Sequence, residues 1–128
     1  MTEDEMSLEQ RRVIRARALD RLDHVLARDL VADPDLVDSV IQRFEFCIEL
    51  CWRMLKAALR LGKVEATSPR ATLRQAYKMS WIDDEAMWLK MLDDRNLTPH
   101  TYKEEVALDV LSRIPGYRDA MRAVLNAP

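Results

Sequence analysis

The stretch from Phe44 to Leu61 constrains the fold of this chain more than any other part of it. Thirteen of its eighteen residues are apolar. The exceptions are Glu45, Glu49, Arg53, Lys56 and Arg60. They follow one another at steps of four, four, three and four residues, and these steps return to the same side of an α-helix. The stretch is therefore predicted to be a helix that is apolar all round except for one narrow polar stripe.

Such a helix has to be covered over most of its circumference. It can be the central helix of a bundle, or it can be buried by the bundle on one side and by a second copy of the chain on the other. A helix in a small monomeric bundle shows a wider polar face than this one. We therefore favour the second arrangement and expect a homodimer formed through this helix.

The rest of the chain also shows helical periodicity, and no stretch alternates like a β-strand. Only two glycines and five prolines interrupt its 128 residues. Capping residues, prolines and glycines place the helix boundaries. The predicted helices span residues 7–30, 33–61, 69–79, 83–95, 98–114 and 117–125. We expect one domain over residues 1–128, an all-α antiparallel up-and-down bundle of four main helices with short extra helices.

Two cysteines and two histidines limit the metal and redox chemistry of the chain. Cys47 and Cys51 lie four residues apart on one predicted helix, a spacing that neither closes a disulfide nor forms a zinc knuckle. We expect them to be small core residues in a reducing compartment, and we expect no metal ion or other cofactor. The acidic N-terminal segment lacks the apolar stretch of a signal peptide, and no long apolar run is present. A cytoplasmic location is expected.

The net charge of −2 conceals a segregation of charge along the chain. Seven basic residues and one acidic residue lie between Arg53 and Lys78, whereas eight acidic and three basic residues lie between Asp83 and Asp109. A run of this kind is usually a solvated face, and the alternative is a surface for RNA or protein. The weak overall charge argues against avid nonspecific binding of nucleic acid.

The segment from Arg95 to Tyr102 carries the strongest indication of chemistry. Arg95 and His100 flank a predicted junction between two helices, so both side chains reach one small volume. If a helix begins at Thr98-Pro99, its unpaired N–H groups favour an anion and keep His100 in the neutral form that a general base needs. The residues thus predict a phosphate-handling site, although a histidine at a helix start is most often a surface residue or a cap.

The same segment, RNLTPHTY, matches the RX4HXY motif of HEPN-domain proteins of the HepT kind. Residues 43–52 read RFEFCIELCW and resemble the RFEFxxELxW segment of that group. Residues 68–70, 82–84 and 88–96 resemble its later landmarks. The similarity extends in order from about Val37 to Ile114. The chain therefore resembles the HEPN-domain family over most of its length.

This resemblance implies a HEPN-like dimeric bundle in which two RX4H motifs share a cleft. HepT-type members are toxins that cut RNA without a metal ion, so Arg95 and His100 are the expected catalytic residues, supported by Asn96 and Tyr102. RNA carries its own nucleophile, the 2′-hydroxyl. A neutral histidine removes that proton, and an arginine stabilises charge on the phosphoryl oxygens. Asn96 either binds the phosphate or holds the junction.

The resemblance also implies a partner, an MntA-like minimal nucleotidyltransferase that neutralises the toxin by transferring AMP to the motif tyrosine, Tyr102. If a helix begins by Pro99, His100 and Tyr102 lie about 200° apart around it, and Tyr102 is left to the second protein. The same group includes nucleotidyltransferase substrate-binding proteins, which would bind nucleotide or substrate without catalysis. A plain helical dimer is a third reading, disfavoured by the intact motif. The sequence does not decide between the first two.

Overall fold

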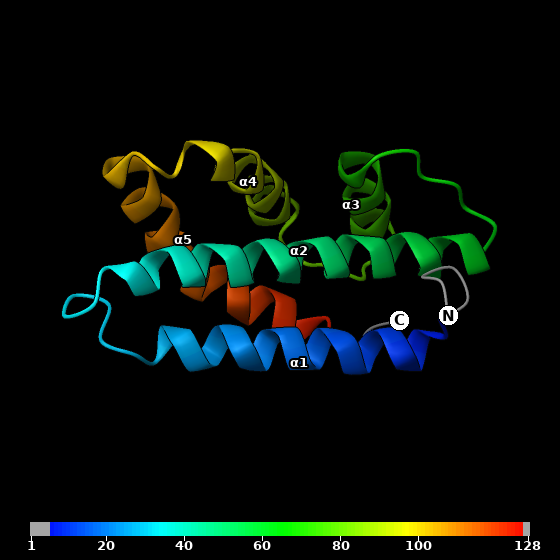
Figure 1. Cartoon of the computed structure of the whole chain (residues 1–128). Coiled ribbons are helices and arrows are strands. Elements are labelled where there is room, and N and C mark those ends of the chain that lie inside the picture. Colours follow the sequence, from blue (N-terminus) through cyan, green and yellow to red (C-terminus); the bar gives the residue numbers. More distant parts are fainter. Residues whose placement is uncertain (1–5, 127–128) are drawn as a thin grey trace.

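The structure, a computed structural model, describes residues 6–126, and within that range it is entirely helical. Two long helices, α1 (Leu8–Leu26) and α2 (Asp35–Leu61), run antiparallel side by side (Figure 1). The shorter helices α3 (Pro69–Lys78) and α4 (Glu85–Asn96) lie across α2 on the side opposite α1. A 3-10 turn, η2 (Thr98–His100), leads into α5 (Glu104–Ala123), which packs along α1 and α2. The all-α fold expected from the sequence is confirmed.

The central helix of this arrangement is α2, which contacts α1, α3, α4 and α5. Its apolar residues bury the core because side chains such as Phe44, Ile48 and Leu55 are 0 % exposed. One of its large apolar side chains, Phe46, remains 45 % exposed. A central helix therefore accounts for most of the apolar circumference of α2, and coverage of the rest by a second copy stays a prediction.

The two cysteines are free thiols in the core of the bundle. Cys47 and Cys51 are each 1 % exposed. Burial away from water disfavours the thiolate and raises the pKa of each thiol to about 12. They pack as small apolar residues, as expected from their spacing.

Two helix boundaries differ from those expected near the first loop. Helix α1 ends at Leu26 instead of near Leu30, and α2 begins at Asp35 with Pro34 at its N-cap. Asp29 explains the first difference, because its carboxylate accepts hydrogen bonds from the backbone N–H groups of residues 31 and 32. A local turn of this kind competes with continuation of the helix.

The expected break at Pro115-Gly116 does not occur, because α5 continues to Ala123. A proline inside a helix costs about 3 kcal/mol. Three side chains on the inner face of α5 around the proline are almost completely buried: Ile114, Tyr117 and Met121. Burial of each contributes about 1.5–3 kcal/mol, and the sum outweighs the cost of the proline.

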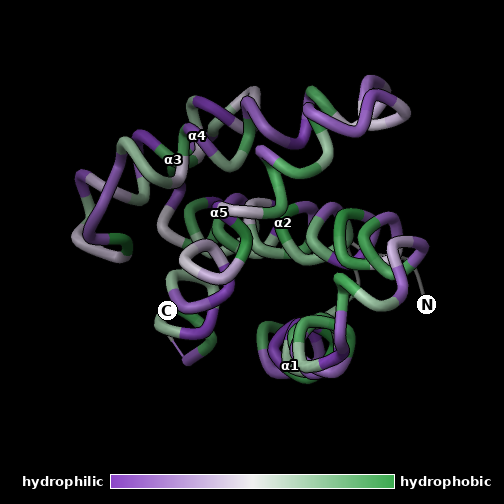
Figure 2. The backbone as a smooth tube through the Cα atoms, turned by 90° about the vertical axis from the view of Figure 1, so that its left-hand side faces the viewer, coloured by the Kyte–Doolittle hydropathy of each residue, from purple (hydrophilic) through white to green (hydrophobic). Residues whose placement is uncertain are grey.

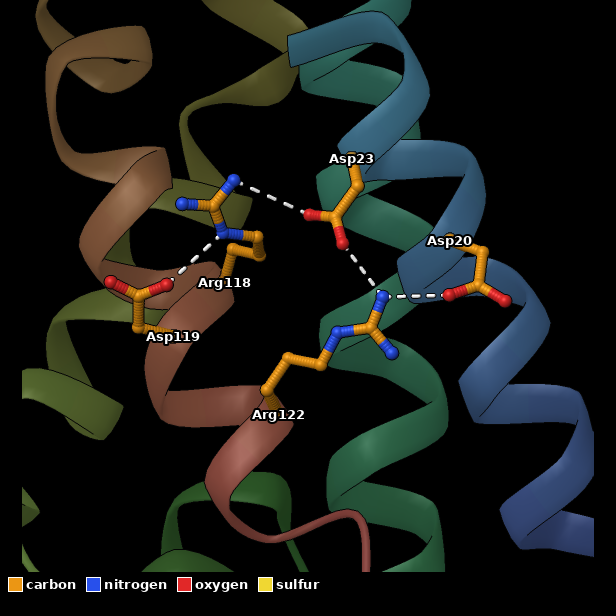
Figure 3. Close-up of polar contacts among 5 residues, drawn as sticks. All are labelled: Asp20, Asp23, Arg118, Asp119 and Arg122. Carbon is orange, nitrogen blue, oxygen red and sulfur yellow. Dashed lines mark hydrogen bonds and ion pairs between the residues drawn. The ribbon is translucent and has the colours of Figure 1, made fainter. Parts of the chain in front are cut away.

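Polar contacts join α1 to α5 on the outside of the bundle (Figure 3). Arg122 lies 2.7 Å from Asp20 and 2.6 Å from Asp23, and Arg118 lies 3.3 Å from Asp23. Exposed ion pairs of this kind each contribute less than about 1 kcal/mol of stability. The apolar core contributes most of the stability of this helix pair, and the ion pairs add to it only slightly. None of the helices within residues 6–126 is long and apolar enough to cross a membrane.

Candidate functional site

Three consecutive residues in the last turn of α4 tie that helix to three different neighbours. Asp93 accepts a hydrogen bond from Arg70 of α3 at 2.6 Å. Asp94 binds α5, and Arg95 forms an ion pair with Glu49 of α2. Consecutive helical residues point about 100° apart, so each faces a different helix. The end of α4 is thereby fixed in position, and with it the direction of Arg95.

The Asp94 carboxylate is the buried part of this arrangement, at 0 % exposure. It accepts hydrogen bonds from Arg113 at 2.7 and 2.8 Å and from the Tyr117 hydroxyl at 2.5 Å. The bonds to Asp94 raise the pKa of Arg113, and burial together with the bond to Asp94 raises the pKa of Tyr117. The Tyr117 ring stacks on Phe44, with 5.5 Å between centroids. A buried carboxylate requires such partners, and Asp94 thus anchors the backbone next to Arg95.

Arg95 is held from the other side by Glu49. Its Nε forms the ion pair with Glu49 Oε1, and Glu49 Oε2 lies 3.4 Å from Arg53 Nε. The Arg95 side chain is 31 % exposed and that of Glu49 is 22 % exposed. The contact is a charge pair without hydrogen-bond geometry, because Glu49 Oε1 accepts no hydrogen bond from a described residue. Arg95 is therefore directed toward a half-buried carboxylate while remaining partly accessible to a ligand. Sequence reasoning placed Glu49 on the polar stripe and in the RFEFxxELxW segment but gave it no role in the site.

A tight turn follows Arg95 and carries His100. The Thr98 hydroxyl donates to the Arg95 carbonyl at 2.8 Å, and the Thr101 hydroxyl donates to the Thr98 carbonyl at 2.7 Å. The backbone N–H of His100 donates to the Leu97 carbonyl at 2.8 Å. These local bonds satisfy the carbonyls at the end of α4 and close the turn as a 3-10 helix.

The expectation that the fifth α-helix begins at Thr98-Pro99 is wrong, because only a 3-10 turn begins there and α5 begins at Glu104. Proline fixes only φ, which suits a 3-10 turn as well as an α-helix, and the threonine hydroxyls favour the turn. The N–H groups of α5 therefore do not form an anion cradle at His100, and they do not account for a neutral imidazole. The 200° separation of His100 and Tyr102 also loses its basis.

The remaining residues of the motif lie at the surface of this junction. Asn96 and His100 are exposed, and Tyr102 is 78 % exposed. The His100 imidazole makes no hydrogen bond or ion pair with another residue within 6–126. The Lys103 ammonium lies 6.0 Å from the centroid of the Tyr102 ring. The structure thus places the motif at the end of α4 and in the turn that follows, and it pairs Arg95 with Glu49 of α2.

Metal-binding groups are not gathered at this junction. No group of three or more histidine, cysteine, aspartate or glutamate side chains within the described part of the chain is placed to hold a metal ion. The groups that the junction offers a ligand are a guanidinium, an imidazole, an amide and a phenol. This set suits contact with a phosphate.

Comparisons with known proteins agree with one another. Residues 10–127 match the family described as nucleotidyltransferase substrate binding protein like. A Haemophilus influenzae protein named probable ribonuclease HepT is 32 % identical over 92 residues, which cover 68 % of this chain and 63 % of that protein. The aligned part is thus less than two thirds of this relative.

Two solved structures share the fold. A Thermus thermophilus protein superposes with a TM-score of 0.81 at 35 % identity, covering 88 % of this chain and 96 % of the other. A Haemophilus influenzae protein described as having the fold of a substrate binding domain of a nucleotidyltransferase also gives a TM-score of 0.81, at 24 % identity, covering 90 % and 96 %.

Proposed function

Because this chain belongs to the nucleotidyltransferase substrate binding protein like family, we propose that it is a HEPN-type subunit that pairs with a minimal nucleotidyltransferase. Its own activity in this proposal is that of a toxin, a metal-independent endoribonuclease. The observation that carries the proposal is the junction after α4, where Glu49 pairs with Arg95 and the imidazole of His100 has no hydrogen-bond or ion-pair partner among the described residues.

The chemistry follows from these residue types. His100 takes the proton from a ribose 2′-hydroxyl, whose oxygen attacks the adjacent phosphorus. The bond from phosphorus to the 5′-oxygen breaks, and that oxygen takes a proton from solvent, leaving a cyclic 2′,3′-phosphate and a 5′-hydroxyl. Arg95 stabilises the negative charge that builds on the phosphoryl oxygens. Asn96, exposed between Arg95 and the turn, offers an amide to the same phosphate.

We further propose a homodimer formed through the exposed apolar residues of α1 and α2. Ile14 is 37 % exposed and Phe46 is 45 % exposed, and both line the surface groove that includes Glu49 and Leu50. Burial of such residues drives association. A dimer at this surface sets the Glu49–Arg95 pair of each copy beside the interface, which suits a shared cleft.

Tyr102 is the proposed point of control by the nucleotidyltransferase. Its 78 % exposure makes the hydroxyl accessible to a second protein. In this step the tyrosine oxygen attacks the α-phosphorus of ATP, pyrophosphate leaves, and the phenolic proton passes to a base of the nucleotidyltransferase. The attached AMP adds negative charge and bulk two residues from His100, and both oppose entry of RNA.

A second function is supported by a different feature of the same site. Arg95 is committed to an ion pair and is only 31 % exposed, which also fits a structural role in a non-catalytic subunit that binds nucleotide or substrate for the nucleotidyltransferase. A subunit of that kind is not toxic, so substitution of Arg95 or His100 would not change cell growth.

Growth after induced expression without the partner separates the two functions. The comparison is between the wild type, His100→Ala and the matched control His24→Ala, which removes the other histidine, an exposed residue on α1. We expect the wild type and His24→Ala to stop growth and His100→Ala to permit it. Normal growth of all three strains contradicts the nuclease and supports the binding subunit.

A further inference from the structure

A groove between α1 and α2, beyond the junction after α4, is rich in positive charge. Its lining residues come from α1, from α2 and from the residues just before α1, and Figure 2 shows the backbone of α5 on one side of this helix pair. We call the part that extends from Glu49 towards the end of α2 the α1–α2 groove. Five of its lining residues are basic and one, Glu49, is acidic. The basic residues are Arg11, Arg15, Arg53, Lys56 and Arg60.

This groove is continuous with the proposed catalytic junction. The two oxygens of Glu49 contact Arg95 on one side and Arg53 on the other. From Arg53, the cations Lys56 and Arg60 follow at steps of three and four residues and therefore lie along one side of α2. At a rise of 1.5 Å per residue the row is about 10 Å long. A ligand that contacts Arg95 can extend directly along this row.

The basic groups are positioned before any ligand arrives. The Arg53 guanidinium lies 5.5 Å from the centroid of the Trp52 ring, a cation–π contact that favours this position by about 0.5–1 kcal/mol. Arg60 pairs with Glu65 at 3.6 Å, but these side chains are 52 % and 68 % exposed, so the pair is weak and readily exchanged. The row can therefore bind an anion without first breaking a strong interaction at Arg60.

The groove also holds hydrogen-bond donors that lack acceptors. Arg15 is 3 % exposed, and only one of its nitrogens is bonded, to the Leu125 carbonyl at 2.9 Å. Its Nε and Nη1 have no acceptor within residues 6–126, and neither does the indole N–H of Trp52. Buried donors without acceptors cost free energy. These atoms are shielded from solvent, so they add positive potential beneath the groove without contacting a ligand themselves.

We propose that the α1–α2 groove binds the phosphate backbone of single-stranded RNA and leads it to Arg95 and His100. The proposal rests on the proposed function for the identity of the polyanion. A cationic groove that tracks a backbone and includes an aromatic side chain is the arrangement that binds single strands without sequence preference. The chain as a whole has a net charge of −2, so the attraction comes from local clusters of cations such as the one in this groove.

The test measures RNA binding separately from cleavage. In a His100→Ala background, fluorescence anisotropy of a labelled single-stranded oligoribonucleotide is recorded over a range of salt concentrations. The groove variant is Lys56→Gln with Arg60→Gln, and the matched control is Arg28→Gln with Lys90→Gln, two exposed cations outside the groove. We expect the groove variant to weaken binding at least tenfold and to reduce the slope of log K against log salt by about 1.4, for two lost phosphate contacts. We expect the control to match its parent.

Equal binding by the groove variant and the control overturns the proposal, and it is also the result expected if the groove serves an acidic protein instead of RNA. Equal thermal midpoints of the two variants establish that any loss of binding is not loss of fold. Cleavage is then measured with the same substitutions and His100 intact. A chain that binds RNA through the groove but cuts none supports this inference and contradicts the proposed function. A chain that cuts RNA at the same rate with and without the groove cations contradicts this inference and supports the proposed function.

Discussion

Arg95 shows how a single residue in this site depends on its surroundings. A guanidinium stabilises a phosphoryl transition state only when its planar fork of N–H donors points at the phosphoryl oxygens. The two groups that direct it lie on different helices: the Glu49 carboxylate on α2, and the Arg95 backbone, which the neighbouring Asp94 anchors to α5. In the proposed reaction Glu49 is thus a positioning residue, because it would act on the substrate only through Arg95.

Replacing Glu49 by glutamine tests this role. Glu49→Gln keeps the shape of the side chain but removes the charge that holds Arg95, so we expect kcat for RNA cleavage to fall by about 10- to 100-fold, with KM and the thermal midpoint nearly unchanged. The matched control is Glu45→Gln, one turn earlier on the same stripe, where no ion pair is formed with a described residue. Equal kcat values for the two variants would contradict the positioning role.

Tyr102 is tested by intact mass after co-expression with the nucleotidyltransferase. The wild-type chain is expected to carry one or more AMP units, and Tyr102→Phe is expected to carry none, because the attacking oxygen is gone. Tyr77→Phe is the control, since Tyr77 is also exposed, at 46 %, but lies on α3. An adduct that persists on Tyr102→Phe, or its absence from the wild type, shows that the switch is not at this tyrosine.

At the scale of elements, α4 is set in place by the three contacts of its last turn. They differ in burial: the Asp94 side chain is 0 % exposed, whereas Asp93 and Arg70 are 51 % and 46 % exposed. Breaking a buried pair by removing one partner costs about 3–5 kcal/mol, and an exposed pair contributes less than about 1 kcal/mol. The contact to α5 therefore dominates.

Two neighbouring substitutions compare these contacts directly. We expect Asp94→Asn to lower the free energy of unfolding by about 3 kcal/mol, near the lower bound, because the Arg113 side chain is 26 % exposed and water partly replaces the lost carboxylate. Asp93→Asn, the control, should lower it by less than about 1 kcal/mol. The measurement is urea unfolding of both variants. Similar unfolding midpoints for the two would show that Asp94 is no anchor.

The starts of the helices show which parts of the fold were predictable from sequence. Ser7 caps α1 with a capping box, and Ser68 caps α3 with Pro69 in its first turn. These signals are local hydrogen bonds, so sequence alone reveals them. Asp84, not Asp83, caps α4, a shift of one residue that local signals do not resolve.

The later part of the chain was less predictable because tertiary contacts decide it. The continuation of α5 past Pro115 depends on burial of Ile114 and Tyr117 against α2 and α4. The partnership of Glu49 with Arg95 likewise depends on how α4 crosses α2. The motif predicts Arg95 and His100 as candidate site residues from the sequence, but neither the motif nor any periodicity predicts the carboxylate that pairs with the arginine.

At the scale of the whole molecule, the basic run between Arg53 and Lys78 is not one surface. Its first part lines the α1–α2 groove, whereas Arg70 pairs with Asp93 on α4. The groove also receives Arg11 and Arg15 from α1, which lie outside the run. Charge along a sequence thus becomes a binding surface only where the fold brings separate helices together.

The dimer is tested by charging its apolar surface. Phe46→Glu should give monomers of normal stability, because Phe46 is 45 % exposed in the single chain and a carboxylate there opposes burial between copies. Leu108→Glu is the control, since Leu108 is 48 % exposed but lies on α5, outside the apolar surface formed by Ile14 and Phe46. Trp52→Glu is less informative because Trp52 is half-buried against the core. Light scattering at micromolar concentration that shows a wild-type monomer, or a Phe46→Glu dimer, contradicts the proposed interface.

The most direct test of the whole account is cleavage of RNA by the purified chain in the presence of EDTA. The wild type is expected to cut single-stranded RNA and to leave cyclic 2′,3′-phosphate ends, because the 2′-hydroxyl is the nucleophile and no metal ion takes part. His100→Ala should lower the rate by about 10²–10⁴-fold, Arg95→Lys should restore little of the activity lost in Arg95→Ala, and His24→Ala should cut at the wild-type rate. If EDTA stops the wild type, or if purified His100→Ala cuts RNA at the full rate, the chain is not the metal-independent nuclease proposed here.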